Sequence, residues 1–122
     1  MESDTTFRGM YMCGDQSGDL SNTEFPAQHV DGHGALGDLF YDKKADIKMG
    51  DTPSVLYLLN GDPSDPEGES WGGQYRRTAH GPSYWTDRTD ELCEDREGAL
   101  TVAKWREQYL RDWQDRMERA LP

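Results

Sequence analysis

The chain has 122 residues, a length that suits one small domain and leaves no room for two. It carries 24 acidic and 13 basic residues, and the net charge of −11 argues against nucleic acids and anionic membranes as partners. Leu, Ile, Val and Phe make up 17 of the 122 residues, too few for the apolar runs of a buried parallel sheet. We therefore expect no self-contained doubly wound α/β domain, while four Trp and six Tyr argue against disorder.

The two cysteines, Cys13 and Cys93, lie 80 residues apart and have no zinc-ligand spacing. One disulfide is open as an alternative, but two unrelated thiols are favoured because small disulfide scaffolds usually carry more bridges. No apolar stretch is long enough for a transmembrane helix. The first residues lack the basic region and apolar core of a signal peptide, so the sequence as given predicts no export signal.

The first half of the chain has one short helical pattern. Leu36, Leu39 and Phe40 stand at i, i+3 and i+4, which predicts a short helix. The segment from Asp15 resembles a calcium-binding loop. An EF-hand needs Gly at position 6 and Glu at position 12, where this chain has Leu20 and Pro26. We therefore expect no EF-hand here.

Residues 51–60 predict the clearest short helix. Asp51 or Thr52 can cap its start, Pro53 suits an early helical position, and Gly61 is a natural end. Residues 55–59 read VLYLL and are apolar on every side, which is typical of a buried helix. The chain has few aliphatic residues to enclose it. Either loops rich in Trp and Tyr cover this helix, or it stays partly exposed toward a partner surface.

Residues 61–98 show no convincing periodicity. Loops this long are usually functional or disordered. Four aromatic residues argue for function or packing: Trp71, Tyr75, Tyr84 and Trp85.

Residues 101–121 predict a C-terminal amphipathic helix. Its apolar stripe recurs at steps of three and four residues and consists of Val102, Trp105, Tyr109, Trp113, Met117 and Leu121. Glu107 with Arg111 and Asp112 with Arg116 form i, i+4 pairs with the acid first, the better orientation. We expect the stripe to pack in the core rather than to bind a ligand.

Few residues stand out as carriers of chemistry, because the chain has no GxSxG elbow, P-loop or GxGxxG motif. Asp51 is either a helix cap or a ligand for a hard cation such as calcium. His33 lies between Gly32 and Gly34, which makes a regular helix and a two-histidine metal site with His29 improbable.

Residues 71–73 and His80 are candidates for ligand contact. Gly72 and Gly73 let the backbone approach a ligand closely, and Trp71 beside them offers a platform for a sugar ring or a base. The same residues also read as a turn held by a packed Trp. His80 is either a supporting hydrogen-bond donor or a polar surface residue.

Several long motifs, in order, resemble one family. They are HGALG at 33–37, KMGDTPSVLYLL at 48–59, GD at 61–62, ESWGG at 69–73 and GALTVAKWR at 98–106. Over about residues 9–120 the chain resembles the C-terminal part of the nucleoside hydrolase-like domain of bacterial cellulose-binding proteins.

The resemblance implies a Rossmann-like α/β family with a parallel sheet. It also implies a calcium ion, held mainly by an Asp-rich cluster, that positions the attacking water. This chain contains no D-x-D-x-x-x-D-D run. We therefore expect residues 1–122 to be a single partial domain, mostly helices and long loops with little or no strand, whose first half with the sheet and metal cluster is absent.

One calcium ligand is implied within this chain. Asp51 resembles the late calcium ligand of the family, an Asp followed by Pro and an apolar helix. The family's His-Asp-Pro reads here as Gly50-Asp51-Thr52-Pro53, so the histidine that would protonate the leaving group is missing. The catalytic residues stay unassigned, and His33, Trp71, Gly72, Gly73 and His80 are the candidate substrate-binding residues.

Three functions follow as hypotheses. The chain is part of a calcium-dependent N-glycosyl hydrolase, inactive alone; or a carbohydrate-binding module without turnover; or an inert truncated remnant. The expected partners are a nucleoside or carbohydrate, the missing N-terminal half of the domain, or a second copy of the chain. The resemblance implies a secreted or periplasmic location for the full-length protein.

Overall fold

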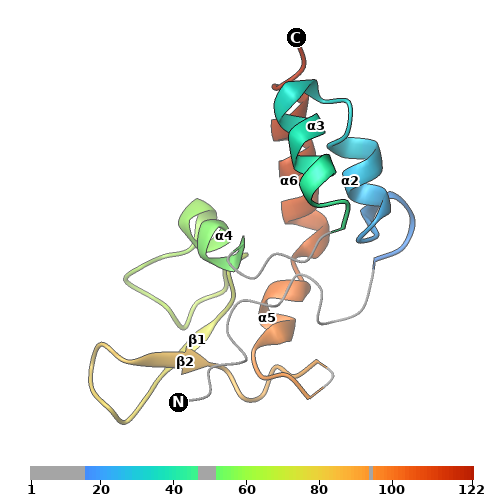
Figure 1. Ribbon diagram of the computed structural model, residues 1–122. Coiled ribbons are helices and arrows are strands. Elements are labelled where there is room, and N and C mark those ends of the chain that lie inside the picture. Colours follow the sequence, from blue (N-terminus) through green and yellow to red (C-terminus); the bar gives the residue numbers. More distant parts are fainter. Residues whose placement is uncertain (1–15, 47–51, 94) are drawn as a thin grey trace. The chain divides into compact units, whose positions relative to one another are not determined.

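The structure is a computed structural model that describes residues 16–46, 52–93 and 95–122. These residues fall into two compact units. The first unit contains 52–93 and 95–106, and the second contains 16–46 and 107–122. The described part is mostly helical with one two-stranded sheet (Figure 1).

The second unit consists of helices only. They are the 3-10 helix η1 (Gly18–Leu20), α2 (Glu24–His29), α3 (Gly34–Lys43) and most of α6 (Arg106–Glu118). Its core centres on Phe25 and Val30, which are fully buried. The ring of Trp113 on α6 lies 5.2 Å from that of Phe25 and 5.3 Å from that of Phe40 on α3, centroid to centroid. Aromatic packing therefore holds α2 and α3 against α6 (Figure 1).

The expected helix around Leu36 is present as α3, but the stripe that predicted it does not face the core. Leu36 is 67% exposed and Leu39 is 55% exposed. The helix instead buries Gly37, where an added Cβ would lie 2.2 Å from the carbonyl oxygen of Val30. Close backbone approach, which only glycine permits here, seats α3.

An ion pair joins the two ends of the second unit. The Arg111 guanidinium on α6 donates to both carboxylate oxygens of Asp19, at 2.6 and 3.1 Å. The Nε2 atom of His29 lies 2.8 Å from the same carboxylate. Hydrogen bonds from Arg111 and then His29 lower the pKa of Asp19 to about 2, so this carboxylate stays charged well into the acid range.

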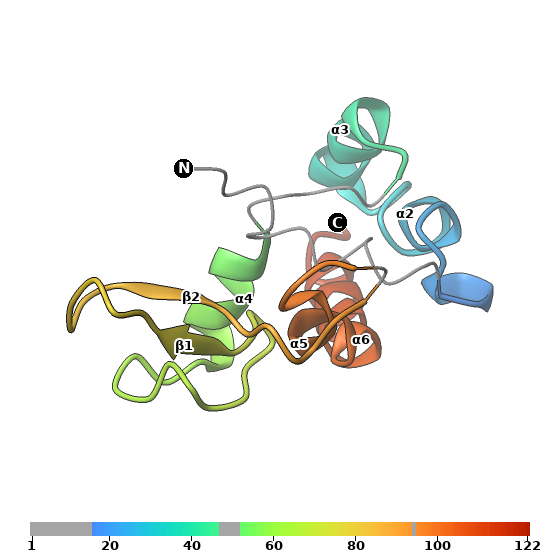
Figure 2. The same ribbon diagram turned by 90° about the horizontal axis from the view of Figure 1, so that it is seen from below.

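The first unit contains α4 (Thr52–Asn60), the strands β1 (Tyr75–Arg77) and β2 (Trp85–Asp87), and α5 (Ala99–Ala103). Figure 2 shows the antiparallel β1–β2 hairpin beside α4. In the part of this unit that the structure describes, the buried apolar side chains include Leu56, Ala99, Val102 and Ala103. The side-chain amine of Lys104, after α5, donates to Glu69 at 2.7 Å and to Gln74 at 3.3 Å, which ties α5 to the segment before β1.

Helix α4 is buried on one face only, which corrects the expectation of a short buried helix over 51–60. Pro53 and Leu56 are buried, whereas Val55, Leu58 and Leu59 are 56%, 84% and 44% exposed. Among the described residues of the first unit, too few aliphatic side chains are present to surround the helix. Of the two alternatives that the composition left open, the structure has the partly exposed one.

The C-terminal helix expected over 101–121 is two helices, α5 and α6. The N–H of Trp105 donates to the carbonyl of Val102, three residues back, which tightens the turn between them. Of the predicted stripe, Val102, Tyr109 and Met117 are buried, and Trp105 and Trp113 are half-buried. Leu121 lies beyond α6 and is 47% exposed, because the helix has ended before it.

Cys93 takes part in a disulfide, so the expectation of two unrelated thiols is wrong for this residue. The other cysteine of the sequence, Cys13, lies outside the described residues. In the described ranges, no helix combines the length and the apolar character that crossing a bilayer requires.

Candidate functional site

Two adjoining cavities open on the first unit, on one side of the β1–β2 hairpin. The aromatic cavity measures about 410 Å³ and is lined by Ser54, Tyr57, Pro63, Pro66, Tyr75 and Trp85. The polar cavity measures about 620 Å³ and is lined by Pro63, Ser64, Asp65, Pro66, Glu67, Arg77, Pro82, Ser83 and Trp85. They share Pro63, Pro66 and Trp85, and we call the two together the aromatic groove.

The strand register places the groove residues of the hairpin on one face. Tyr75 is paired with Asp87, and Arg77 is paired with Trp85. Because side chains alternate along a strand, Tyr75, Arg77 and Trp85 share a face while Arg76 points to the other. A hairpin of only three residue pairs is thus enough to bring an aromatic ring from each strand to one side.

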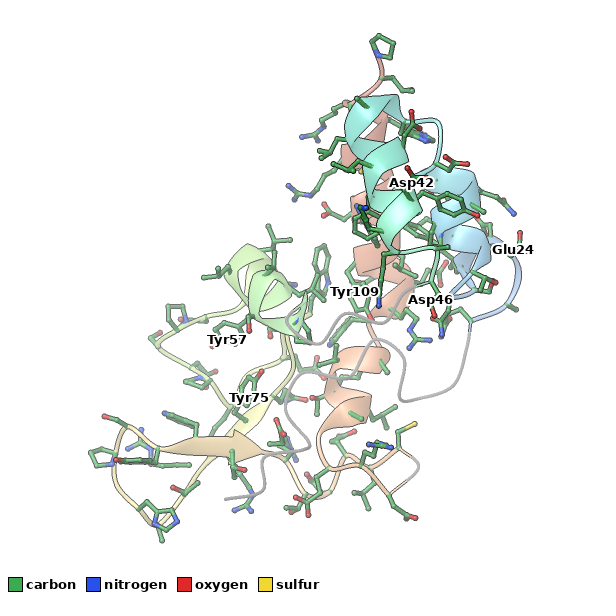
Figure 3. The ribbon with its side chains drawn as sticks, in the orientation of Figure 1. Glu24, Asp42, Asp46, Tyr57, Tyr75 and Tyr109 are labelled. Atoms are coloured by element: carbon green, nitrogen blue, oxygen red, sulfur yellow. The ribbon has the colours of Figure 1, made fainter. Side chains whose placement is uncertain are left out.

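The two tyrosines of the aromatic cavity are fixed by hydrogen bonds. The hydroxyl of Tyr57 donates to the carbonyl of Asp62 at 2.7 Å, and that of Tyr75 donates to the carbonyl of Gly72 at 2.8 Å. Their rings meet edge to face with centroids 6.0 Å apart, and Figure 3 shows Tyr57 on α4 above Tyr75 on β1. Both rings are therefore held in place before any ligand arrives.

Neither tyrosine is suited to act as a base or nucleophile. Burial, followed by the charge of Asp87, raises the pKa of Tyr75 to about 12. Burial also raises the pKa of Tyr57, with smaller contributions from two nearby carboxylates. Both phenols are neutral at physiological pH, so their contribution to the cavity is ring surface.

Trp85 lines both cavities. It is half-buried, and the Arg77 guanidinium carbon lies 4.9 Å from its ring centroid. At this distance the cation is attracted to the face of the indole. Arg77 thereby restricts the motion of Trp85 and brings a positive charge to the polar cavity.

The loop between α4 and β1 builds the rest of the groove and is well held. The carboxylate of Asp62 accepts hydrogen bonds from the backbone N–H and the hydroxyl of Ser64, at 2.8 and 2.6 Å, and these bonds lower the pKa of Asp62. The N–H of Tyr75 donates to the carbonyl of Pro66 at 3.0 Å, which fastens the loop to β1. Pro63 and Pro66 restrict the backbone further, so the groove is preformed.

The groove combines ring surface with hydroxyls, two carboxylates and one guanidinium. Ligand sites are typically mostly apolar, with a few polar groups that orient the ligand. Carboxylates accept hydrogen bonds from hydroxyl groups, and a guanidinium donates them. The arrangement suits a ligand that has both flat apolar faces and many hydroxyls.

Trp71, Gly72 and Gly73 lie next to the groove but do not line its two cavities. They form a turn in which the N–H of Gly73 donates to the carbonyl of Ser70. The N–H of Trp71 donates to the Asn60 side chain at 2.8 Å, which fastens this turn to the end of α4. Gly72 packs against the backbone of Tyr57 and accepts the hydrogen bond of the Tyr75 hydroxyl, and direct contact of residues 71–73 with a ligand stays a prediction.

The other predicted site residues lie elsewhere. His33 precedes α3 in the second unit, and its Nδ1 lies 3.1 Å from the carbonyl of Asp31. His80 is exposed between β1 and β2, and its ring lies 6.3 Å from that of Tyr84. Asp51 lies outside the described residues. Among the residues that are described, no three or more acidic, histidine or cysteine side chains gather as they would around a metal ion.

In the sequence, Tyr75 and Trp85 argue against disorder, but no pattern assigns them, Tyr57 or Arg77 to a site. Tyr57 lies within the apolar run VLYLL at residues 55–59, where an aromatic residue is expected to pack in the core. The sequence signal for a shared face is the alternation in YRR (75–77) and WTD (85–87), where the first and third side chains of each strand lie on the same face. Three residues are too few for this signal to stand out.

The chain matches one known protein family over more than half of its length. A family model described as "Cellulose-binding Sde182, nucleoside hydrolase-like domain" matches residues 3–75, more than half of the chain. The match includes Tyr57 and Tyr75 and ends before Trp85. Searches of curated proteins and of solved structures gave no match. The chain belongs to the nucleoside hydrolase-like domain family of cellulose-binding Sde182 proteins.

Proposed function

We propose that this chain binds a carbohydrate through the aromatic groove and does not hydrolyse glycosyl bonds by itself. The observation that carries the proposal is the meeting of Tyr57, Tyr75 and Trp85 in one preformed cavity of about 410 Å³. The family is described as cellulose-binding, which supports a sugar as the ligand.

The chemistry of β-linked glucose suits such a cavity. Its hydroxyls are equatorial, so the two ring faces present C–H groups and are apolar. These faces pack on aromatic rings, while the hydroxyls at the rim exchange hydrogen bonds with carboxylates and guanidinium groups. In the groove, Asp65, Glu67 and Arg77 are the charged groups available at the rim.

The finer family assignment is also part of the proposal. We infer that the chain corresponds to the C-terminal part of a Rossmann-like nucleoside hydrolase fold. In the complete domain, Asp51 would help to hold calcium, which would supply an activated water for cleavage of an N-glycosyl bond. The described residues do not form a calcium site. No catalytic step is therefore assigned to them.

The proposed location and protein partners rest on two observations. The disulfide at Cys93 supports an oxidising compartment, in agreement with a secreted or periplasmic protein. The exposed Val55, Leu58 and Leu59 on α4 support contact with a further part of the domain or with a second copy of the chain. Contact with a nucleic acid or an anionic membrane is not part of the proposal, because the net charge of −11 would repel both.

Carbohydrate binding is tested by calorimetric titration with cello-oligosaccharides. Trp85→Ala should weaken binding by about tenfold or more, because truncation of a central aromatic contact typically costs about 2 kcal/mol. Tyr84→Ala is the matched control, since Tyr84 is 60% exposed on the same hairpin and lines neither cavity. Equal losses in the two variants, or no binding by the wild type, would contradict the proposal.

We expect the purified chain to release no ribose from inosine or uridine, with or without added calcium. The reason is chemical: without the Asp-rich run, Asp51 alone cannot hold calcium and also orient a water. A reducing-sugar assay measures the release. Turnover that disappears in Asp51→Ala would show that the chain is a hydrolase in its own right.

A further inference from the structure

The groove is larger than one sugar requires, and it is divided. The aromatic and polar cavities measure about 410 and 620 Å³, and each volume alone falls within the range of about 300–1,000 Å³ that is typical of small-ligand sites. Both cavities lie against Trp85, Pro63 and Pro66. A ligand that passes Trp85 therefore enters the second cavity without leaving the protein surface.

The two cavities differ in their chemistry. The aromatic cavity is lined by aromatic and proline side chains and by one other residue, Ser54, which offers a hydroxyl. The polar cavity instead offers hydroxyls from Ser64 and Ser83, carboxylates from Asp65 and Glu67, and the guanidinium of Arg77. One cavity is built for the face of a ring and the other for its hydroxyl rim.

Arg77 stands at the junction of the cavities. It lines the polar cavity, and its guanidinium lies over the Trp85 ring, so it can donate hydrogen bonds to a ligand while it stays stacked. The guanidinium has several N–H donors, and stacking leaves those in its plane free to point sideways. Arg77 is thus placed to contact a sugar that follows one already stacked between the tyrosines and Trp85.

The charges of the polar cavity disfavour an anionic ligand. Asp65 and Glu67 outnumber the single Arg77, and the whole chain carries a net charge of −11. A carboxylate on the ligand, such as that of a uronic acid, would meet repulsion from both the cavity and the chain. Neutral hydroxyls meet no such penalty.

We propose that the two cavities are consecutive subsites for a linear neutral β-linked glucan of at least two glucose units, with Arg77 as the residue that recognises the second unit. This rests on the proposed carbohydrate binding and deepens it. A single nucleoside or monosaccharide would fill only the aromatic cavity, whereas an oligosaccharide would fill both.

The experiment is a titration of wild type and variants with glucose, cellobiose, cellotriose and cellotetraose. In the wild type, affinity should rise at least tenfold from glucose to cellotriose. Arg77→Ala should lose most of that gain, measured as the ratio of the cellotriose affinity to the glucose affinity, because the change also removes the cation that lies over Trp85. The matched control is Arg96→Ala, which removes the same charge from an exposed position of the first unit that lines neither cavity, and which should keep the full gain.

A second variant protects the test against misfolding. Asp65→Asn alters the polar cavity without changing a residue of the hairpin strands, and it should also reduce the gain in affinity with length. It therefore serves as the test if Arg77→Ala does not fold. Equal affinity for all lengths in the wild type, or tight binding of oligogalacturonate, would overturn the subsite proposal while the proposed function stands. Absence of binding to every cello-oligosaccharide would instead overturn the proposed function itself.

Discussion

Trp113→Ala should unfold the second unit. The Trp113 ring packs against Phe25 of α2 and Phe40 of α3, so its removal takes away the contact that both helices share with α6. Truncation of a core aromatic costs about 3–5 kcal/mol, a large share of the roughly 5–15 kcal/mol that stabilises a typical domain. Because Trp113 is half-buried, we expect the lower end of this range. Hydrogen exchange of peptides from residues 16–46 should speed up to near the unfolded rate.

The control for this variant is Asp115→Ala, an exposed position two residues further along α6. Arg111→Ala is unsuitable as a neutral control, because the Arg111 guanidinium binds both oxygens of Asp19 and also the side chain of Gln114. Similar exchange rates in Trp113→Ala and Asp115→Ala would show that the aromatic contacts do not hold the second unit together.

Gly72→Ala should strongly destabilise the first unit. A Cβ at this position would lie 2.4 Å from the carbonyl oxygen of Pro53 and 2.6 Å from the backbone nitrogen of Tyr57. Both are backbone atoms of α4, so neither can move without the helix, and overpacking of this kind costs about 1–3 kcal/mol or more. Thermal unfolding followed by circular dichroism should show a fall in Tm of about 10 °C.

This variant also separates a supporting role of Gly72 from direct ligand contact. If Gly72 only seats α4 and accepts the Tyr75 hydrogen bond, affinity and stability should fall together. The control for stability alone is Gly68→Ala, where the nearest atom to an added Cβ is a side-chain oxygen of Asp65, which can move aside but also lines the polar cavity. A Gly72→Ala protein with wild-type Tm that no longer binds sugar would show that Gly72 touches the ligand.

Local features were predictable because they depend on neighbours in sequence. The helix that begins at Thr52 and ends before Gly61 follows from an early Pro53, a run of apolar residues and a terminal glycine. The family was predicted from motifs that lie mostly within the matched residues 3–75. The predicted turn at Trp71–Gly73 is also present, where the glycines permit close backbone approach.

The groove was not predictable in the same way, because its walls come from separate segments. Tyr57 belongs to a helix, Pro63 and Pro66 to a loop, and Trp85 to a strand. Strands of three residues have no clear period, so the shared face of Tyr75 and Trp85 is defined only by their pairing.

The sequence by itself predicted helices around Leu36, over residues 51–60 and near the C-terminus, and the family to which the chain belongs, since apolar spacing, helix-end residues and motifs are local properties. It did not predict α2. Only the tertiary structure decided which side of each element is covered. It exposes Leu58 on α4 and Leu36 on α3, ends α5 before Trp105, and gathers three aromatic rings beside Arg77. The physical reason is that burial depends on what packs against a residue, and those neighbours lie far away in the sequence.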